Sequence, residues 1–373
     1  MTDQLIAPPG LKHLVVADTT VGGVRGNEGF YHYRQYNAVE LARTRGFEAI
    51  VGLLLDGQLP DPASELSIRT ELAAHRLLDG PTLDLLKTLA SHNVSPLAGL
   101  RAAISILVDD TPVIDLTHTE RRARTLKVIA AVPAVVGVLY RYSSDATPLA
   151  ADPGLGHAAD YVRMVTGTVP RPELIRAVEI YLCLTADHGF NASTFATRVI
   201  TSTGASVSSA LAGAVGALSG PLHGGAPSRV LDMLADIGDV SNTEKWAMRE
   251  LEAGRPIMGF GHAVYRAEDP RSVLLKELAL TIGGPTVVKA VAVEERLSTL
   301  LADWKPGATL VTNVEYYAAI VLHLAELPAE LFTSTFATAR VLGWSAHLLE
   351  QAGSNKIMRP SARYVGPLPA QDS

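Results

Sequence analysis

Apolar residues recur every three or four positions along most of the chain, the periodicity of helices that bury one face. Three long segments show this pattern clearly, and we predict helices in "RPELIRAVEIYLCLTADHG" (171–189), "GPTVVKAVAVEERLSTLLADW" (284–304) and "PAELFTSTFATARVLGWSAHLLEQAG" (328–353). Strand-like segments do not alternate with these helices. We therefore predict a mainly α-helical fold and no parallel-sheet nucleotide-binding fold.

Two helix starts carry residues that favour capping. Ser241 and Glu244 in "SNTEKWAMRELEAG" have the spacing of a capping box, and Gly254 is placed to end that helix. Asp269 followed by Pro270 predicts an N-cap with proline at the first helical position.

Strand signals are concentrated near the start of the chain. Residues 11–34, "LKHLVVADTTVGGVRGNEGFYHYR", contain β-branched runs separated by glycines. This pattern predicts a small β-hairpin.

Composition narrows the class of protein. The chain has 373 residues, 47% of them hydrophobic and 19% charged, which favours a globular protein large enough for two domains. A formal charge of −6 argues against a nucleic-acid partner. Cys183 is the only cysteine, so no disulfide framework and no thiolate metal cluster is expected.

The sequence also favours a cytoplasmic protein. The start, "MTDQLIAPPG", lacks the pattern of a secretory signal. The most apolar run, "VIAAVPAVVGVLY" (128–140), is shorter than a membrane span of about 20 residues and is interrupted by Pro133. The small-residue segment "SSALAGAVGALSG" (208–220) fits a tightly packed central helix or a subunit interface, and equally an ordinary buried helix.

Several familiar motifs are absent from the chain. It contains no GxxxxGK[ST] loop, no HExxH and no GxSxG, which disfavours P-loop, zinc-protease and common hydrolase chemistry. "GLGHAA" (154–159) fits a loose dinucleotide pattern but follows a proline-containing loop instead of a strand.

Three histidines have unusual neighbours: His188 in "ADHGFN", His223 in "GPLHGG" and His262 in "GFGHAV". Glycines beside a histidine let a ligand approach the backbone. A helix starting nearby disfavours the protonated ring, and a neutral imidazole can donate a hydrogen bond to a carbonyl that is becoming an enolate. A single such histidine is more often a buried structural residue.

Charged residues in apolar segments complete the candidate site. Arg271, Arg340 and Arg359 suit a small polycarboxylate, because the planar guanidinium binds carboxylates in bidentate fashion. Glu315 follows a predicted N-cap, Asn313, among apolar residues, where burial raises a carboxyl pKa and makes it a better base. A helix-start glutamate favoured by the helix dipole explains the same pattern equally well.

Four blocks of the sequence resemble the citrate synthase family, which includes the 2-methylcitrate synthases. They are "ADHGFNASTFATRVITSTGASVSSALAGAVGALSGPLHGGAP", "GFGHAVYRAEDPR", "TNVEYYAAIV" and "KIMRPSARYVGP", and weaker similarity covers nearly the whole chain. The resemblance implies a helical homodimer with a large domain, residues 1–223 and 326–373, and a small domain, residues 224–325, that closes over a cleft. It also implies condensation of an acyl-CoA with oxaloacetate, without a metal or a redox cofactor. No nucleic-acid or membrane partner is expected, given the net charge and the short apolar run described above.

The resemblance also implies a role for each candidate residue. Glu315 takes the position of the base, His223 stabilises the enol, and His262 acts as the acid on the oxaloacetate carbonyl. His188, Arg271 and Arg340 are expected to bind oxaloacetate, with Arg359 reaching into the site of the partner subunit. Coenzyme A is expected to contact Arg266 and the backbone of Met258, Gly259, Phe260 and Gly261.

The sequence departs from the family at the base. Glu315 stands where the family usually has Asp, and Gly189 stands where Glu is common after the histidine. We predict a citrate synthase that uses acetyl-CoA, via Glu315, His223 and His262. The alternatives are a 2-methylcitrate synthase that uses propionyl-CoA, and a paralogue that binds these ligands without turnover.

Overall fold

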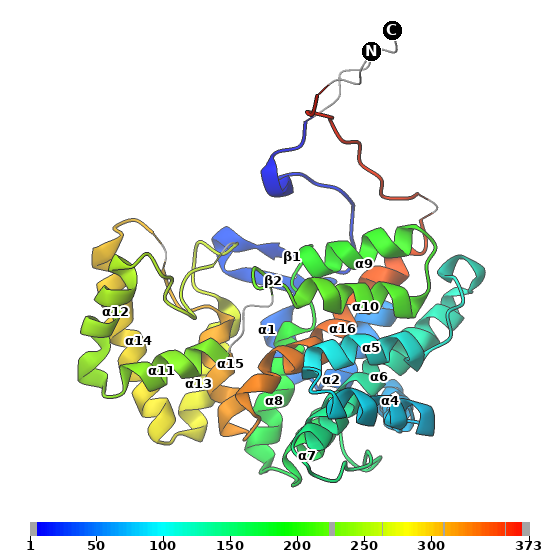
Figure 1. The fold of residues 1–373 in the computed structure, drawn as a ribbon, viewed down its shortest axis with the longest axis horizontal. Helices are drawn as coiled ribbons and strands as arrows, with labels where there is room; N and C mark the ends of the chain where they lie inside the picture. The colour runs from blue at the N-terminus through cyan, green and yellow to red at the C-terminus, as the bar shows by residue number, and fades with distance from the viewer. Residues whose placement is uncertain (1–5, 224–227, 263, 309, 355, 368–373) are drawn as a thin grey trace.

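The computed structural model describes residues 6–223, 228–262, 264–308, 310–354 and 356–367, and within them it confirms a mainly helical fold (Figure 1). The first ten helices are α1 (Ala38–Thr44), α2 (Phe47–Asp56), α3 (Pro62–His75), α4 (Gly80–Ser91), α5 (Pro96–Leu107), α6 (His118–Ser143), α7 (His157–Thr166), α8 (Pro172–Thr185), α9 (Ala192–Ser202) and α10 (Val207–Leu218). The remaining helices are α11 (Ser228–Ile237), α12 (Thr243–Glu252), α13 (Pro270–Ile282), α14 (Pro285–Trp304), α15 (Val314–Leu324) and α16 (Phe332–Gln351).

The predicted hairpin is present and has one more strand than expected. β1 (Gly22–Arg25) pairs antiparallel with β2 (Phe30–Tyr33), and the short β3 (Tyr36–Asn37) adds to β2. Tyr31 and Tyr33 donate their hydroxyl protons to the carbonyl oxygens of Leu184 and Cys183, at 3.0 and 2.8 Å. These bonds attach the sheet to the end of α8.

One of the two predicted helix starts is wrong. α13 begins as expected, since Asp269 accepts a hydrogen bond from the Arg271 N–H and Pro270 follows it. α12, however, begins at Thr243, and Ser241 makes no capping bond to it. Asp239 caps a preceding 3-10 turn, Val240–Asn242, and takes up the Ser241 N–H at 2.8 Å. Gly254 does follow the end of α12 with a φ of 68°.

Pro133 does not interrupt its apolar segment, contrary to expectation. α6 continues through Pro133 for 26 residues and begins with a capping box formed by Thr117 and Glu120. By length and composition alone α6 could span a membrane, but 78% of its most apolar stretch is buried inside the protein. Such burial is typical of a core helix.

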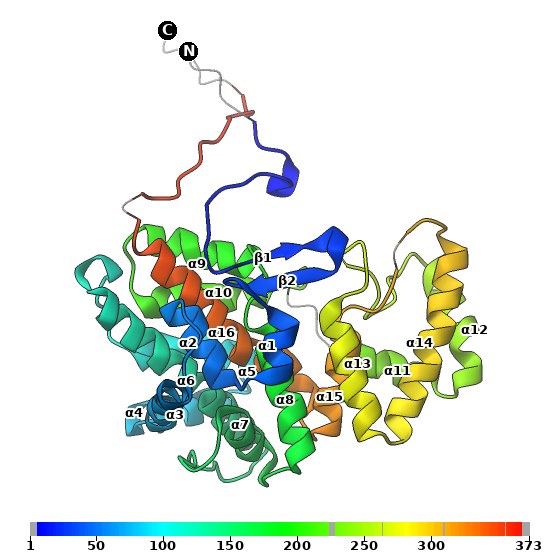
Figure 2. The same cartoon turned by 180° about the vertical axis from the view of Figure 1, so that it is seen from behind.

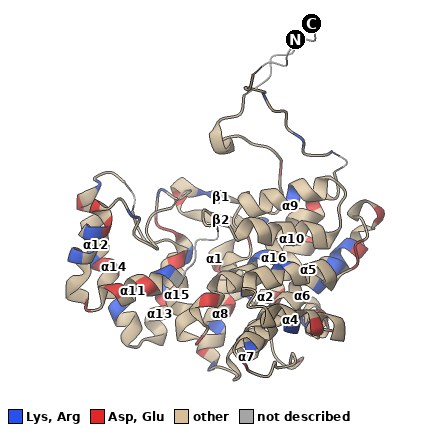
Figure 3. Cartoon of the chain, in the orientation of Figure 1, with Lys and Arg blue, Asp and Glu red and all other residues tan. Residues whose placement is uncertain are grey.

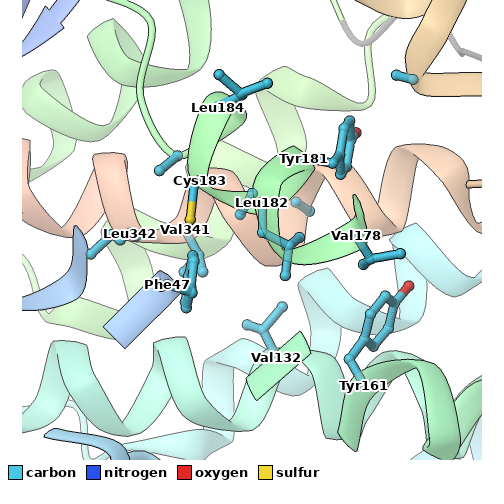
Figure 4. Close-up of a cluster of buried hydrophobic side chains, with 14 of the residues drawn as sticks. Phe47, Val132, Tyr161, Val178, Tyr181, Leu182, Cys183, Leu184, Val341 and Leu342 are labelled. Atoms are coloured by element: carbon cyan, nitrogen blue, oxygen red, sulfur yellow. The ribbon is translucent and has the colours of Figure 1, made fainter. Parts of the chain in front are cut away.

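The core forms around α8 and α16. α16 is buried along nearly its whole length, and it packs against α6, α8, α9 and α2. Figure 4 shows part of this core, in which Cys183 and Leu182 of α8 lie near Phe47, Val341 and Leu342. Gly343 lets α16 approach the end of α8, because an added Cβ would lie 2.3 Å from the Ala186 carbonyl oxygen.

The small-residue segment 208–220 forms most of α10, which packs against α9, α5 and α16. Figure 3 shows no charged residue on α10, whereas α12 and α14 carry several. The position of α10 fits the expected tightly packed helix.

Figures 1 and 2 show α11, α12, α13 and α14 gathered on one side of the molecule, with α15 between them and the rest. α13 and α15 pack against α8, which joins the two parts. The division at residues 223/224 and 325/326 stays a prediction.

The first and last described segments of the chain extend away from the body as two neighbouring arms, drawn in dark blue and dark red (Figures 1 and 2). Apolar side chains on these arms are exposed, among them Val15, Ile357, Tyr364 and Val365. Exposed apolar residues on an extended arm are typical of a segment that contacts another chain.

Candidate active site

A cavity of about 680 Å³ lies where the two parts of the molecule meet. Its wall comes from β1, the end of α8 and the loop after it, the turn that ends at His223, and the starts of α13 and α15, with one face of α16. Gly261, His262 and Val264 also line it. Six of the residues predicted for catalysis or oxaloacetate binding line it: His188, His223, His262, Arg271, Glu315 and Arg340. The structure thus brings together side chains that are up to 152 residues apart in the sequence (Arg340 minus His188).

His262 is held in one orientation by the backbone that follows it. Its Nδ1 accepts hydrogen bonds from the N–H groups of Val264 and Tyr265, at 2.9 and 3.0 Å. A neutral ring held in this way carries its proton on Nε2. Burial, and then the neighbouring Arg271, lower the pKa of His262 from 6.5 to about 4. At neutral pH His262 is therefore an uncharged donor.

Asp269 connects the starts of two helices. Its carboxylate accepts two hydrogen bonds from the Arg271 guanidinium, at 2.9 and 2.8 Å, and one from the Val314 N–H at 3.0 Å. Although burial favours the neutral acid, Arg271 holds the pKa of Asp269 below its ordinary value. The ionised Asp269 therefore fixes Arg271 relative to α15.

Glu315 lies in the first turn of α15. Asn313 caps this helix and accepts a hydrogen bond from the Glu315 N–H at 2.9 Å. Burial raises the pKa of Glu315 from 4.5 to about 7, although the positive charges of Arg271 and Arg229 oppose the rise. A carboxylate with this pKa is a stronger base than an ordinary glutamate.

His223 contacts the start of α9. Its Nε2 lies 2.8 Å from the Ser193 hydroxyl and accepts the Ser193 backbone N–H at 3.3 Å, which leaves the proton on Nδ1. The Trp344 indole donates to the same hydroxyl at 3.0 Å. Burial, and then Arg340, lower the pKa of His223, so this ring is also uncharged at neutral pH.

His188 and Arg340 complete the polar wall. The Nε2 of His188 lies 2.9 Å from the Tyr265 hydroxyl, and burial, followed by Arg271, holds the pKa of His188 well below its ordinary value. Arg340 donates from Nε to the Thr185 carbonyl at 2.8 Å and lies over the Phe336 ring at 4.5 Å. Within the described residues Arg340 forms no ion pair, so this buried cation can accept an anionic ligand.

The remaining predicted residues lie elsewhere. Arg359 is exposed on the C-terminal arm and does not reach the cavity of its own chain. Arg266 donates to the carbonyls of His262 and Tyr265, at 3.2 and 3.3 Å. Their predicted roles toward the partner subunit and coenzyme A stay predictions.

Residues 258–261 support α15, and of these four only Gly261 lines the cavity. The Gly259 carbonyl accepts the Asn313 N–H at 2.8 Å, and the Gly261 carbonyl accepts the Asn313 side-chain amide at 2.9 Å. Phe260 forms a single β-bridge with Thr312, and Met258 packs against the core. Gly259 has a φ of +80°, and an added Cβ would lie 2.9 Å from Tyr316, so glycine is required there.

Sequence reasoning missed several polar residues of the site. Ser193 and Asn191 lie in "HGFNAST", directly after His188, and this polar helix start is a signal that could have revealed them. Tyr265 and Tyr181 gave no signal, because tyrosines in apolar segments resemble core residues. Within the described part of the chain, no group of three or more His, Cys, Asp or Glu residues is placed to hold a metal ion.

Comparison with known proteins gives the family. The family model described as "Citrate synthase, C-terminal domain" matches residues 10–361. The chain belongs to the citrate synthase family. This family consists of acyltransferases, which agrees with the enzyme class predicted from the sequence.

The similar proteins include both types of synthase. The chain is 35% identical to a citrate synthase of Haloferax volcanii over 96% of this chain and 95% of that one. It is also 35% identical to a 2-methylcitrate synthase of Mycobacterium tuberculosis, over 96% of this chain and 90% of that one. The chain is thus equally identical to these two relatives, which have different names.

Solved structures of the citrate synthase family share the fold. A Thermoplasma acidophilum citrate synthase, solved as a ternary complex with carboxymethyl coenzyme A and oxaloacetate, superposes with a TM-score of 0.88 at 26% identity, covering 97% of each chain.

Proposed function

We propose that this chain condenses an acyl-CoA with oxaloacetate, with citrate or 2-methylcitrate and free coenzyme A as products. The observation that carries the proposal is the meeting of Glu315, His223 and His262 in one cavity beside two buried arginines. This combination suits a reaction that removes a proton from carbon next to an anionic acceptor substrate.

Oxaloacetate is a keto-dicarboxylate, and the arginines suit its two carboxylates. Arg340 has no ion pair within the described residues, while Arg271 is aligned by the two hydrogen bonds that it donates to Asp269. Bidentate arginine contacts fix both the position and the orientation of a carboxylate. His188, next to both arginines in the cavity wall, would add a polar contact.

The carbon–carbon bond requires two concerted proton movements. Glu315 takes a proton from the acyl carbon, while the Nδ1–H of His223 donates to the thioester oxygen. One such donor is typically worth about 3–4 kcal/mol. The resulting enol attacks the ketone carbon of oxaloacetate as the Nε2–H of His262 protonates the ketone oxygen. Water then cleaves the thioester, and these steps require only acid–base groups.

We propose that oxaloacetate binds first and that closure of the two parts of the molecule then excludes water until condensation is complete. The site lies between these parts, and its residues come from both of them. Hydrolysis of acetyl-CoA in the absence of oxaloacetate would contradict this order.

Two acyl groups are candidates for the substrate, acetyl and propionyl. Acetyl and propionyl differ by one methylene, and an apolar pocket distinguishes such groups by only about 1–3 kcal/mol. We favour acetyl-CoA, and the equal similarity to the 2-methylcitrate synthase keeps propionyl-CoA as the second candidate. A paralogue without turnover is the third reading, because Glu315 replaces the usual Asp.

We also propose a homodimer in which the C-terminal arm places Arg359 at the partner's site. The exposed apolar residues of both arms support this assembly. Coenzyme A would then lie along residues 258–261 and Arg266, at the mouth of the cavity.

The test is an assay of thiol release with purified protein, using acetyl-CoA and propionyl-CoA, each with and without oxaloacetate. We expect release that depends on oxaloacetate and is nearly abolished by Glu315→Gln and His223→Ala. Glu173→Gln and His118→Ala, two exposed helix-start residues, serve as matched controls and should retain full activity. Absence of oxaloacetate-dependent release in the wild type would refute the function, and wild-type rates in either site variant would refute the assigned roles.

A further inference from the structure

Tyr181 differs from every other buried tyrosine of the described chain. Seven tyrosines are buried, and six of them have a hydrogen-bond partner for the hydroxyl group. Three of them donate to backbone carbonyls: Tyr31 to Leu184, Tyr33 to Cys183 and Tyr316 to Ala290. The other three bond to side chains: Tyr161 to Thr335, Tyr265 to His188 and Tyr317 to Glu294. The Tyr181 hydroxyl has no partner.

An unpartnered hydroxyl of this kind requires an explanation. Folded proteins pair the great majority of their buried polar groups, because leaving one unpaired loses its hydrogen bonds to water. Tyr181 is only 1% exposed, so bulk water does not replace the missing partner.

The position of Tyr181 points to a ligand. It lines the cavity from α8, one helical turn before Thr185, whose carbonyl oxygen accepts the Nε–H of Arg340 at 2.8 Å. Figure 4 shows Tyr181 on the opposite side of α8 from Cys183, at the edge of the apolar cluster. Tyr181 therefore belongs to the residues of the cavity wall, and its hydroxyl oxygen is buried and unpaired.

The charged groups around Tyr181 indicate which kind of ligand group would accept a hydrogen bond from its hydroxyl. Burial raises the pKa of Tyr181 far above its ordinary value, so the hydroxyl keeps its proton and can donate. Tyr161, Arg340, Glu315 and Arg271 act on it electrostatically, in that order. Arg340 is thus the strongest ionic influence, and it is the buried cation that lacks an anion.

We propose that the Tyr181 hydroxyl donates a hydrogen bond to the carboxylate that Arg340 binds, which makes Tyr181 a further binding residue for the keto-dicarboxylate substrate. This inference rests on the proposed function and adds a neutral donor to its arginines. The cavity wall then offers both a charged fork and a directional hydroxyl to one carboxylate.

Tyr161 provides a matched control. It is buried in the same core, and its hydroxyl lies 2.6 Å from that of Thr335, so its hydrogen bond is complete without a ligand. Tyr161 does not line the cavity. The substitutions Tyr181→Phe and Tyr161→Phe remove the same atom from two places.

The experiment measures the dissociation constant of oxaloacetate by calorimetry and the melting temperature without ligand. Tyr181→Phe should weaken oxaloacetate binding about tenfold or more, because a hydrogen bond to a charged group is lost. Its melting temperature should stay equal or rise, because no protein partner loses a bond. Tyr161→Phe should leave binding unchanged and lower the melting temperature by a few degrees.

Unchanged oxaloacetate binding by Tyr181→Phe would overturn the inference, whether or not the acyl-CoA KM changes. A fall in melting temperature with unchanged binding would show a structural role instead. Tyr181→Met, which keeps an apolar side chain, repeats the measurement if the Phe variant folds poorly. A wild type that neither binds oxaloacetate nor releases thiol would refute the proposed function itself, and that result is distinct from a failure confined to the variants.

Discussion

Two buried arginines show how the core and the site differ. Arg76, which does not line the cavity, donates to the Asp160 carboxylate at 3.0 Å and to the Leu155 carbonyl at 2.8 Å. Arg340 is as well buried, yet within the described chain it donates a hydrogen bond to the Thr185 carbonyl and pairs with no carboxylate. One cation is neutralised by the fold, and the other is not.

This difference identifies the site on physical grounds. Removing a charge from water is costly unless an opposite charge compensates it. Burial lowers the pKa of both arginines, and nearby carboxylates, Asp160 for Arg76 and Asp187 for Arg340, oppose that shift. Asp187, however, does not lie within ion-pair distance of Arg340. The core thus pairs its Arg76 charge within the chain, whereas the described chain supplies no carboxylate within ion-pair distance of Arg340.

Replacing Arg340 should have the largest effect on activity. We expect Arg340→Met to lower kcat/KM for oxaloacetate on the order of 10²–10³-fold, since truncating a buried charged contact typically costs about 2–5 kcal/mol. The free energy of unfolding should not fall, because an uncompensated cation is removed. Steady-state kinetics and urea denaturation of the same preparation test both parts, and a clear loss of stability would show that Arg340 is paired within the fold.

Replacing Arg76 should have the opposite pattern. Arg76→Met leaves Asp160 buried with only Arg163 beside it, at 2.8 Å, and should lower the free energy of unfolding by about 2–4 kcal/mol. The activity per folded molecule should stay unchanged. If Arg76→Met keeps its full free energy of unfolding, or if its folded molecules turn over more slowly than the wild type, the proposed difference between the two arginines is wrong.

Glu315 extends the comparison of core and site to the pH dependence of the free energy of unfolding. Its pKa is near 7 in the folded chain and 4.5 as an ordinary glutamate, so between these values the unfolded state releases its proton first and stability falls as pH rises. Glu315→Gln should therefore increase the free energy of unfolding by about 1–3 kcal/mol at pH 8 and by almost nothing at pH 4. Melting curves across this range test the sign, and an equal gain at both pH values would contradict it.

The sequence predicted the helices and the hairpin because both depend on local periodicity and turn residues. It also supplied the six residues that meet in the cavity, but their assembly came from family resemblance, since spacing along a chain does not determine proximity in a helical fold. The capping box at Ser241 was wrong because Asp239, two residues earlier, takes the same N–H group.

Other features depend on contacts that no local pattern contains. Asp269 was predicted as a cap for its own helix, but its bond to the Val314 N–H joins residues 45 positions apart. Tyr181 lies in an apolar helix and is distinguished only by the absence of a partner. Pro133 was expected to break a segment that α6 passes through without interruption.

The double attachment of Asp269 has a consequence for how this protein can change. Since one carboxylate fixes both Arg271 and the first turn of α15, the proposed anchor for the dicarboxylate and the proposed base are coupled in position. Substitutions that adjust one of them will also displace the other. Substitutions in parts of the cavity wall that Asp269 does not contact, such as β1 and the Phe336 face of α16, are therefore the simpler way to change the substrate preference.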